Sequence, residues 1–431
     1  MDESIVSPSI CHTASKSAKL NLYVFNEKSR AAVYGIGTYI RELTGALSGG
    51  NVNICVVHLK ADKPQIQFEE QDGIRHWYFP DAMHKQLTID HKKKSELFYR
   101  NIAFLLRLHI EDKNNLIFHL NYNQSRKLAE ELKKIFDCRI VTAIHYLDWC
   151  FSLSGNISRF RQILDNSEVN HGEFEKSIIR TYREEKEFLK NVDHVICLSE
   201  NTRKIIQDFY NIRSDKISVL YNGLTDCTLI KDKPALRQKY SVPDIPVILF
   251  VGRLDNVKGL SYALRAFKTV VNTITSVHFI IVGNGAFSLY MKECEDIWRQ
   301  ITWTGLINKE KLYDLYSIAD IGIMPSFHEQ CSYVAIEMMM HGVPLIASTT
   351  TGLREMVEDG ITGLHIPVEE HSDRVEIDTD HFAEKMIFML KNTAEAKKMR
   401  ENSRKRYLNE YSAEIFQKNI MRFYLSLFQT K

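Results

Sequence analysis

Short apolar runs alternate with amphipathic stretches along most of this chain. In the first half, residues 95–108 and 125–136 repeat apolar side chains at helical spacing and predict helices. The runs that predict strands lie at residues 20–25, 52–58, 75–79, 116–120, 140–145, 194–198 and 217–221. Strands that alternate with helices favour a parallel, doubly wound sheet.

The same alternation starts again after a charged stretch, residues 226–246, which contains three prolines and is predicted to be a linker. Apolar runs at 247–252, 277–282 and 320–324 predict strands, and residues 260–273 predict an amphipathic helix. The chain therefore fits an α/β fold of two Rossmann-like domains facing a central cleft. The expected divisions are a polar tail (1–18), an N-terminal domain (19–225), the linker, a C-terminal domain (247–410) and a last helix (411–431).

Composition narrows the class of protein. The 431 residues are 44% hydrophobic and 26% charged with a formal net charge of +2, so a nucleic-acid partner is not expected. The first 18 residues are polar and no apolar run is long enough to span a bilayer, so a cytoplasmic location is expected. The basic start at His91-Lys92-Lys93-Lys94 before an amphipathic helix leaves open a peripheral contact with the inner membrane face, although an ordinary packed helix fits as well.

The strongest functional signal is the stretch from Glu329 to Glu337, two carboxylates with seven residues between them. The pattern predicts a strand, a loop and a helix, and ligands bind at such carboxyl ends of strands in open α/β sheets. Both carboxylates could instead form structural salt bridges. Glu337 lies in an otherwise apolar helix, however, so it needs a partner, and sugar or ribose hydroxyls would serve. Ser332 is a candidate N-cap, and the amides of residues 332–334, including Tyr333 and Val334, could cradle a phosphate.

Two further loops carry candidate anion-binding groups. Arg253 and Lys258 follow a predicted strand and precede a helix, which favours pyrophosphate over a merely solvated loop. Gly35 and Gly37 occupy the equivalent place in the first half. They would let backbone amides approach an anion, but a plain strand-to-helix turn fits equally well.

His145 ends a predicted strand, where a histidine can donate a hydrogen bond to a substrate or serve a structural role. Asp378-Thr379-Asp380 has the form of a metal-binding motif. No apolar strand precedes it, so helix capping by Asp380 is the better interpretation. No metal site is therefore expected.

Taken together, these residues resemble the GT-B glycosyltransferases, and most closely the retaining enzymes of family 4, from about residue 20 to the last helix. The resemblance rests on Glu329 and Glu337 and on the following His341-Gly342-Val343-Pro344 segment. It implies that Glu337 binds the ribose of a nucleotide sugar and that Glu329 approaches the donor sugar. Arg253 and Lys258 match the pair that holds the diphosphate.

The resemblance also implies roles for four further residues and an overall reaction. Gly35 and Gly37 match the first-domain glycine loop, Asn284 another cleft loop, and His145 a histidine near the donor sugar. The last helix would return to the N-terminal domain. The implied reaction is retaining and metal-independent, needs no cofactor, and moves a sugar from a nucleotide-diphosphate sugar to a carbohydrate, a lipid-linked sugar or a peptide.

Departures from the family pattern keep alternatives open. Gln330-Cys331-Ser332 replaces the usual Pro-Phe-Gly, at a place expected to read the sugar. A nucleotide-sugar epimerase on the same fold is one alternative. A catalytically inactive partner subunit is another, which the altered segment motivates. The retained Arg253, Lys258, Glu329 and Glu337 favour the transferase.

Overall fold

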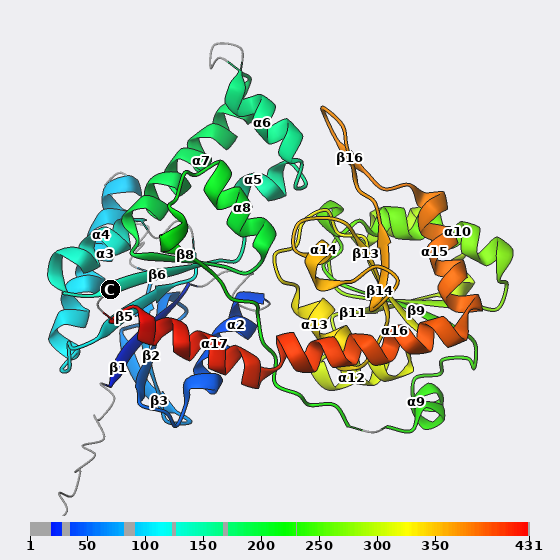
Figure 1. The fold of residues 1–431 in the computed structure, drawn as a ribbon, viewed down its shortest axis with the longest axis horizontal. Coiled ribbons are helices and arrows are strands. Elements are labelled where there is room, and N and C mark those ends of the chain that lie inside the picture. The colour runs from blue at the N-terminus through cyan, green and yellow to red at the C-terminus, as the bar shows by residue number, and fades with distance from the viewer. Residues whose placement is uncertain are drawn as a thin grey trace, which may run out of the picture.

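Two lobes lie side by side, each built around a largely parallel β-sheet with helices on both faces (Figure 1). The structure is a computed structural model, and it describes residues 19–27, 35–81, 91–122, 126–166, 171–229 and 231–429. The predicted pair of parallel-sheet domains is confirmed.

The N-terminal lobe is an eight-stranded sheet. Its strands are β1 (Leu20–Glu27), β2 (Val52–Ala61), β3 (Gln67–Gln71), β4 (Ile74–Pro80), β5 (Leu116–Leu120), β6 (Arg139–Ile144), β7 (His194–Cys197) and β8 (Ile217–Val219). Their order across the sheet is β3-β4-β2-β1-β5-β6-β7-β8, and only the edge pair β3–β4 is antiparallel. The central strands are almost wholly buried because helices cover both faces, as in other parallel sheets.

Seven helices of the described chain belong to this lobe. The direction in which successive strands are added to the sheet reverses beside β1. The helices are α2 (Gly35–Leu47), α3 (His91–His109), α4 (Arg126–Ile135), α5 (Asp148–Ser152), α6 (Ile157–Asp165), α7 (Glu173–Asn191) and α8 (Glu200–Asp208). Strands β2 and β4 extend to one side of β1 and strands β5 to β8 to the other. Such a switch point is where open α/β sheets form a ligand crevice.

The C-terminal lobe repeats this plan with a six-stranded, wholly parallel sheet. Its strands are β9 (Val247–Val251), β10 (His278–Val282), β11 (Ile301–Gly305), β12 (Ile321–Met324), β13 (Leu345–Ser348) and β14 (Gly363–Ile366), in the order β11-β10-β9-β12-β13-β14. The switch point lies between β9 and β12, which pair directly. The loops that follow these two strands therefore meet at the same edge of the sheet.

The helices of this lobe complete the two covering layers. They are the 3₁₀ turn η3 (Asn256–Lys258), α10 (Leu260–Thr273), α11 (Phe287–Glu293), α12 (Lys309–Ile318), α13 (Tyr333–Met340), α14 (Leu353–Met356), α15 (Thr379–Lys391) and α16 (Thr393–Arg406). Asp378 caps α15 by accepting hydrogen bonds from the amides of Asp380 and His381. Capping was the predicted role of this acidic segment, but Asp378 provides the cap instead of Asp380.

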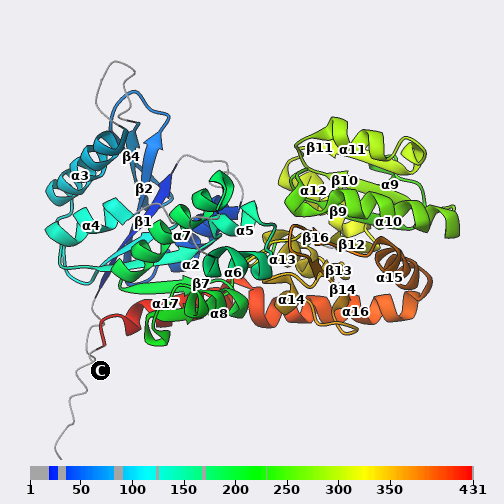
Figure 2. The ribbon, with the colours of Figure 1, turned by 90° about the horizontal axis from the view of Figure 1, so that it is seen from above.

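The chain passes between the lobes twice, and the two connecting segments are in contact with each other. After α16, a π-helical turn η5 (Tyr407–Tyr411) leads into α17 (Ala413–Ser426), which lies along the N-terminal lobe (Figure 2). There the Tyr424 hydroxyl lies 2.8 Å from His119 Nδ1. The outgoing chain pairs with the returning one at Leu224, whose amide donates to the Tyr411 carbonyl at 2.9 Å. Both crossings thus lie on one side of the cleft.

Two elements have no clear signal in the sequence. Helix α9 (Lys233–Lys239) lies inside the predicted linker and packs on the C-terminal lobe, where Lys233 and Arg237 form ion pairs with Asp320. A hairpin of β15 (Glu369–Glu370) and β16 (Val375–Glu376) projects from the C-terminal lobe. Its strands are two residues long and charged, so no period-two apolar pattern reveals them.

Candidate active site

Glu329 lies in the loop between β12 and α13, and its side chain forms an ion pair with Lys258 of η3. The Ser326 hydroxyl also donates to this carboxylate at 3.2 Å. Lys258 and Glu329 are 71 residues apart in the chain. They meet because their loops follow the neighbouring strands β9 and β12. Their side chains are 18% and 13% exposed, so both remain within reach of a ligand in the cleft.

The backbone around Glu329 is held by the loop after β13. The Thr351 hydroxyl lies 3.0 Å from the Glu329 amide, and the Gly352 amide donates to the Glu329 carbonyl at 2.8 Å. A β-carbon at Gly352 would lie 1.5 Å from the Gln330 carbonyl oxygen, so only glycine fits there. The loop after β13 therefore fixes the position of the Glu329 backbone.

Glu337 lies in α13 and is far more buried, with a side chain only 2% exposed. Tyr316 of α12 donates to one carboxylate oxygen at 2.9 Å, and Lys309 pairs with the other. Burial and the adjacent carboxylate raise the pKa of the Tyr316 hydroxyl well above its usual value, so it remains a donor. Glu337 therefore has partners within the protein, the alternative that the sequence left open beside sugar or ribose hydroxyls. Lys309 carries no motif signal and was missed in the sequence.

Arg253 stands in the loop after β9, 42% exposed, with its guanidinium 3.1 Å from the Asp255 carboxylate. It also lies 5.9 Å from the ring centre of Phe151, a residue of α5 in the other lobe. Asp255 caps η3 by accepting from the Lys258 amide at 3.2 Å. At Gly259, where φ is +68°, a β-carbon would lie 2.0 Å from the Pro325 carbonyl oxygen, so the loops after β9 and β12 are in close contact.

Asn284 supports this loop through its backbone. Its carbonyl accepts from the Leu254 amide at 3.0 Å, and its side-chain oxygen accepts from the Gly285 amide at 2.9 Å. Gly283, with φ of +149°, lies so close to the Gly252 carbonyl oxygen that a β-carbon would be 1.7 Å away. The structure thus brings Asn284 beside Arg253, with an exposed side chain.

Ser332 occupies the N-cap position of α13, but its hydroxyl makes no capping hydrogen bond. Its amide points to the Met356 sulfur at 3.3 Å. Tyr333 and Val334 form the first turn, where helix amides have no acceptor within the helix. The Tyr333 hydroxyl is buried without a partner among the described residues, and burial and nearby charged groups, including Glu42 of α2, raise its pKa well above the usual value. The start of α13 therefore faces α2.

Gly35 and Gly37 form the first turn of α2. A β-carbon at Gly35 would meet nothing within 4 Å among the described residues, so none of their contacts explains a glycine at this position. The residues just before it lie outside the described chain.

His145 directly follows β6, and its ring packs edge-on against Tyr39 of α2 with centroids 4.7 Å apart. Its Nε2 lies 3.0 Å from the Asn121 side-chain oxygen. The Asn121 nitrogen donates to the Phe25 carbonyl at 3.0 Å, so His145 Nε2 carries the proton and Nδ1 is left as an acceptor. Burial, with the neighbouring His119, lowers the pKa of His145 to about 3, so the ring is neutral near pH 7.

Gln330 and Cys331, two of the residues that depart from the family pattern, contact the N-terminal lobe. The Gln330 oxygen accepts from Thr202 of α8, and the Cys331 carbonyl accepts from the Asn222 side chain at 2.7 Å. Glu355 similarly caps the start of α8, accepting from the Glu200 amide at 2.8 Å. The altered segment therefore joins the two lobes.

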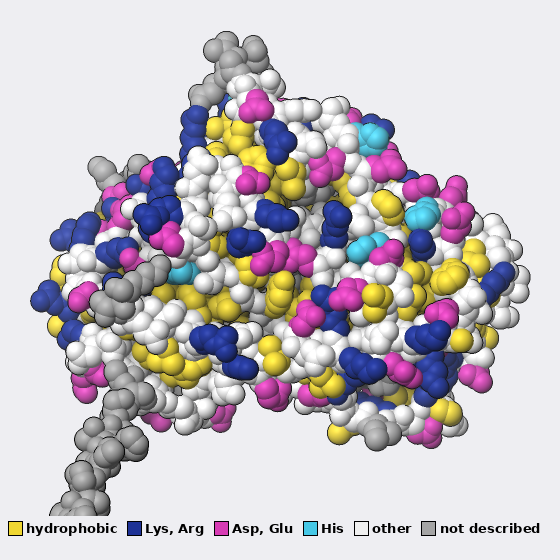
Figure 3. Space-filling view, viewed as in Figure 1, with side chains coloured by type: hydrophobic (Ala, Val, Ile, Leu, Met, Phe, Trp, Pro, Cys, Tyr) yellow, Lys and Arg dark blue, Asp and Glu magenta, His cyan; other side chains and the backbone are white. Residues whose placement is uncertain are grey.

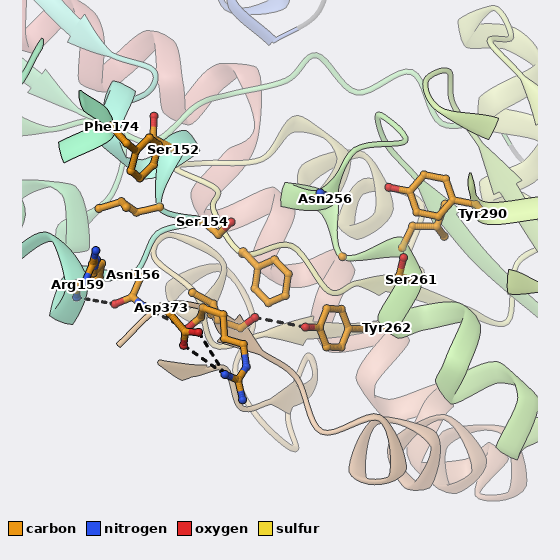
Figure 4. Close-up of a pocket in the computed structure, with 16 residues that line it drawn as sticks. Ser152, Ser154, Asn156, Arg159, Phe174, Asn256, Ser261, Tyr262, Tyr290 and Asp373 are labelled. Atoms are coloured by element: carbon orange, nitrogen blue, oxygen red, sulfur yellow. Dashed lines mark hydrogen bonds and ion pairs between the residues drawn. The ribbon is translucent and has the colours of Figure 1, made fainter. Parts of the chain in front are cut away.

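The hairpin closes the opposite rim of the cleft. Asn156, the N-cap of α6, donates to the carbonyls of His371 and Arg374 at 2.7 and 3.2 Å. Beneath the hairpin lies a cavity of about 430 Å³, lined by both lobes and including Ser154, Tyr262 and Asp373 (Figure 4). Figure 3 shows acidic and basic side chains over both lobes, including the region where the lobes meet. Within the described chain, no cluster of three or more potential metal ligands was found.

Two family models match the chain. The model described as "Glycosyltransferase Family 4" matches residues 33–226, and that described as "Glycosyl transferases group 1" matches residues 232–406. An uncharacterized glycosyltransferase of Methanocaldococcus jannaschii is 30% identical over 181 residues, which are 40% of this chain and 46% of that protein. The matched region thus spans about half the length of the curated relatives.

Solved structures agree in fold. Sucrose-phosphate synthase from Thermosynechococcus elongatus superposes with a TM-score of 0.74 at 21% identity, covering 95% of this chain and 99% of that one. Anabaena HepE in complex with UDP and glucose superposes at 0.70 with 15% identity, covering 94% and 100%. The resemblance seen around Glu329 and Glu337 is confirmed. This chain belongs to the glycosyltransferases of the GT-B fold and is of the family 4 type.

Proposed function

We propose that this protein transfers a sugar from a nucleotide-diphosphate sugar to a carbohydrate-type acceptor, with retention and without a metal ion. The observation that carries the proposal is the Lys258–Glu329 ion pair at the switch point of the C-terminal lobe, with Arg253 on the same loop. A donor diphosphate placed there would meet two cations and a carboxylate at the point where its sugar bond breaks.

Lys258 and Arg253 would neutralise the charge that develops on the departing diphosphate, the role a metal ion fills in other enzymes. In the free protein Lys258 is held by Glu329. Binding would therefore exchange one anionic partner of Lys258 for another and release Glu329 toward the donor sugar. The amides of the first turn of α13 would add hydrogen bonds to a phosphate.

Glu337 would accept hydrogen bonds from the donor ribose, and Tyr316 and Lys309 would hold its carboxylate in place. His145, with Nδ1 as an acceptor, would bind a donor-sugar hydroxyl. Gly35 and Gly37 would let the α2 amides approach the same sugar. Front-face attack by the acceptor hydroxyl gives retention without a covalent intermediate. A diphosphate oxygen would take the acceptor proton.

UDP is the first nucleotide to test, because the structure of HepE is a complex with UDP and glucose. Purified protein would be heated with UDP, GDP, ADP, CMP and dTDP, with and without EDTA. A ligand at 100 times its dissociation constant should add about 2.7 kcal/mol of stability. One diphosphate standing out, equally with EDTA, is the expected result. No shift with any of them would overturn the donor site and favour an inactive partner subunit.

Product analysis separates transfer from epimerisation. Incubation with the selected nucleotide sugar should release the nucleoside diphosphate, by transfer or by slow hydrolysis. An epimerase would instead return an intact nucleotide sugar with one inverted centre. Recovery of only the latter would contradict the proposal.

We also propose that the exposed face of α3 contacts an anionic membrane surface. Leu97, Phe104 and Leu108 are 47%, 44% and 77% exposed and lie on one helical face, with Arg100 over the Phe104 ring. The helix starts with His91 and three lysines. Apolar side chains flanked by cations suit an anionic lipid surface. None of the helices in the described chain is long and apolar enough to cross a bilayer.

Vesicle sedimentation tests this contact. We expect binding to vesicles with phosphatidylglycerol, little to pure phosphatidylcholine, and loss of binding in Leu108→Glu. Leu289→Glu, a substitution at a 61% exposed leucine of α11 in the other lobe, is the matched control. Equal sedimentation of both variants would exclude the α3 face.

A further inference from the structure

His328 is a buried histidine whose two ring nitrogens have no hydrogen-bond partner among the described residues. It is 4% exposed and directly precedes Glu329. Its ring packs edge-on against Phe151 of the N-terminal lobe, with centroids 5.5 Å apart and planes at 82°. Phe151 also lies under Arg253. His328 therefore sits on the seam between the lobes, beside the cations proposed to hold the diphosphate.

The ring is neutral at physiological pH. Burial, together with the positive charge of Lys258, lowers the pKa of His328 to about 3. A neutral imidazole has one donor nitrogen and one acceptor nitrogen. Each buried polar group without a partner costs roughly 1–3 kcal/mol. A ligand hydroxyl would satisfy one nitrogen of this ring, either by donating to the acceptor nitrogen or by accepting from the donor nitrogen.

The position of His328 is fixed by the backbone on either side. The Phe327 amide donates to the Val257 carbonyl at 2.7 Å, and the Thr350 hydroxyl donates to the Phe327 carbonyl. Gly155 of the N-terminal lobe fits so closely that a β-carbon would lie 2.5 Å from the Phe327 carbonyl oxygen. Since the lobes already touch here, the ring cannot swing into solvent without separating them.

We propose that His328 is a specificity-determining residue that binds a hydroxyl of the donor sugar when the lobes are closed. The inference rests on the proposed donor site, because it places the sugar beside Glu329 and the diphosphate beside Lys258. His328 would act on the sugar and not on the nucleotide, since its neutral ring adds no charge toward phosphate. His145 would read the same sugar from the N-terminal lobe.

The test compares a nucleoside diphosphate with its sugar conjugate. Dissociation constants for UDP and UDP-glucose, or for the diphosphate selected above and its hexose conjugate, are measured for wild type, His328→Phe and His328→Gln. His328→Phe keeps the packing against Phe151 but removes both hydrogen-bonding atoms. We expect it to raise the dissociation constant of the sugar conjugate about tenfold and to change that of the diphosphate less than twofold. His328→Gln retains a donor and an acceptor and should recover most of the loss.

His278→Gln is the control, because His278 is also buried but lies on β10 with Thr302 Oγ1 2.8 Å away. In ¹⁵N-histidine-labelled protein, the NMR chemical shifts of the His328 ring nitrogens should change when the conjugate binds and not when the diphosphate binds. This measurement does not require a variant to fold. Equal changes for both ligands, or none, would overturn the proposal in favour of a structural ring satisfied by water. Failure of the wild type to bind any diphosphate would instead overturn the donor site itself.

Discussion

The C-terminal lobe contains two lysine–glutamate pairs, Lys258–Glu329 and Lys309–Glu337. Their glutamates are only eight positions apart in the chain, yet the two pairs differ in what surrounds them. Glu329 and Lys258 are both partly exposed, at 13% and 18%. Glu337 is buried, at 2%, while its partner Lys309 is 53% exposed. Tyr316 holds the Glu337 carboxylate from inside the lobe, whereas Ser326, on the loop after β12, donates to the Glu329 carboxylate.

This difference indicates that the two ion pairs have different roles. The Lys258–Glu329 pair joins two loops at the mouth of the cleft, so a ligand can replace either partner. The carboxylate of Glu337 is fixed by the protein, and only its accessible lysine can move. The first pair suits a site where charge changes during reaction, and the second suits a site that recognises an unchanging part of the ligand.

Replacing the two lysines should reveal the largest difference between the two pairs. Lys258→Ala removes a cation from the proposed leaving group and should reduce turnover about 10²–10³-fold, as loss of one charge-stabilising donor does elsewhere. Lys309→Ala should reduce turnover no more than about tenfold, because Lys309 is largely solvated and weakly coupled. Steady-state release of the nucleoside diphosphate measures both. Near-normal turnover in Lys258→Ala would remove its proposed role.

Replacing the two carboxylates should act on nucleotide binding in opposite directions. Glu337→Gln weakens the proposed hydrogen bonds to ribose and should cost roughly 1.5–3 kcal/mol, about 10–100-fold in the diphosphate dissociation constant. Glu329→Gln frees Lys258 and should leave diphosphate binding equal or tighter while lowering turnover. Calorimetric titration with the selected diphosphate distinguishes them. A similar loss in both variants would mean that the pairs serve one role.

Each pair has a neighbouring histidine, and lowering the pH should reduce stability to a different extent through each of them. The pKa of His328 is lowered to about 3 by burial and Lys258, and the pKa of His341, beside Glu337, is lowered less far by burial. The unfolded chain therefore binds more protons between pH 6.5 and 3, so stability is full above pH 6.5 and falls as pH drops. His328 should contribute a loss of roughly 1.4 kcal/mol at pH 5.5. Urea unfolding at pH 7.5 and pH 5.5 measures how much of the free energy of unfolding is lost in acid. This loss should be smaller in His328→Asn than in wild type, and His341→Asn should reduce it by less.

Tyr316→Phe should have the smallest effect. It removes the 2.9 Å hydrogen bond to Glu337 without changing shape. The buried carboxylate oxygen loses its donor, so the free energy of unfolding should fall by about 1–2 kcal/mol. Turnover at saturating donor should change little, because Lys309 still pairs with Glu337. Thermal unfolding checks the first point, and a fall in turnover beyond about tenfold would contradict the second.

Much of the fold followed from local patterns. The helix predicted at 260–273 coincides with α10, and the strands predicted at 247–252 and 320–324 end or begin within a residue of β9 and β12. The edge strand β3 and the β15–β16 hairpin were missed because their sequences are short and charged. Lys309 was missed because it resembles any solvated lysine at the start of a helix.

The sequence by itself determined the family, the two-domain plan and the spacing of Glu329 from Glu337, because these depend on periodicity and on short motifs. Only the tertiary structure decided that Lys258 pairs with Glu329, since β9 and β12 must first become neighbours at the switch point. It also decided that Gln330 faces α8 and that His328 is buried against Phe151. Such contacts join residues far apart in the chain, and no local pattern encodes which side of a loop faces which lobe.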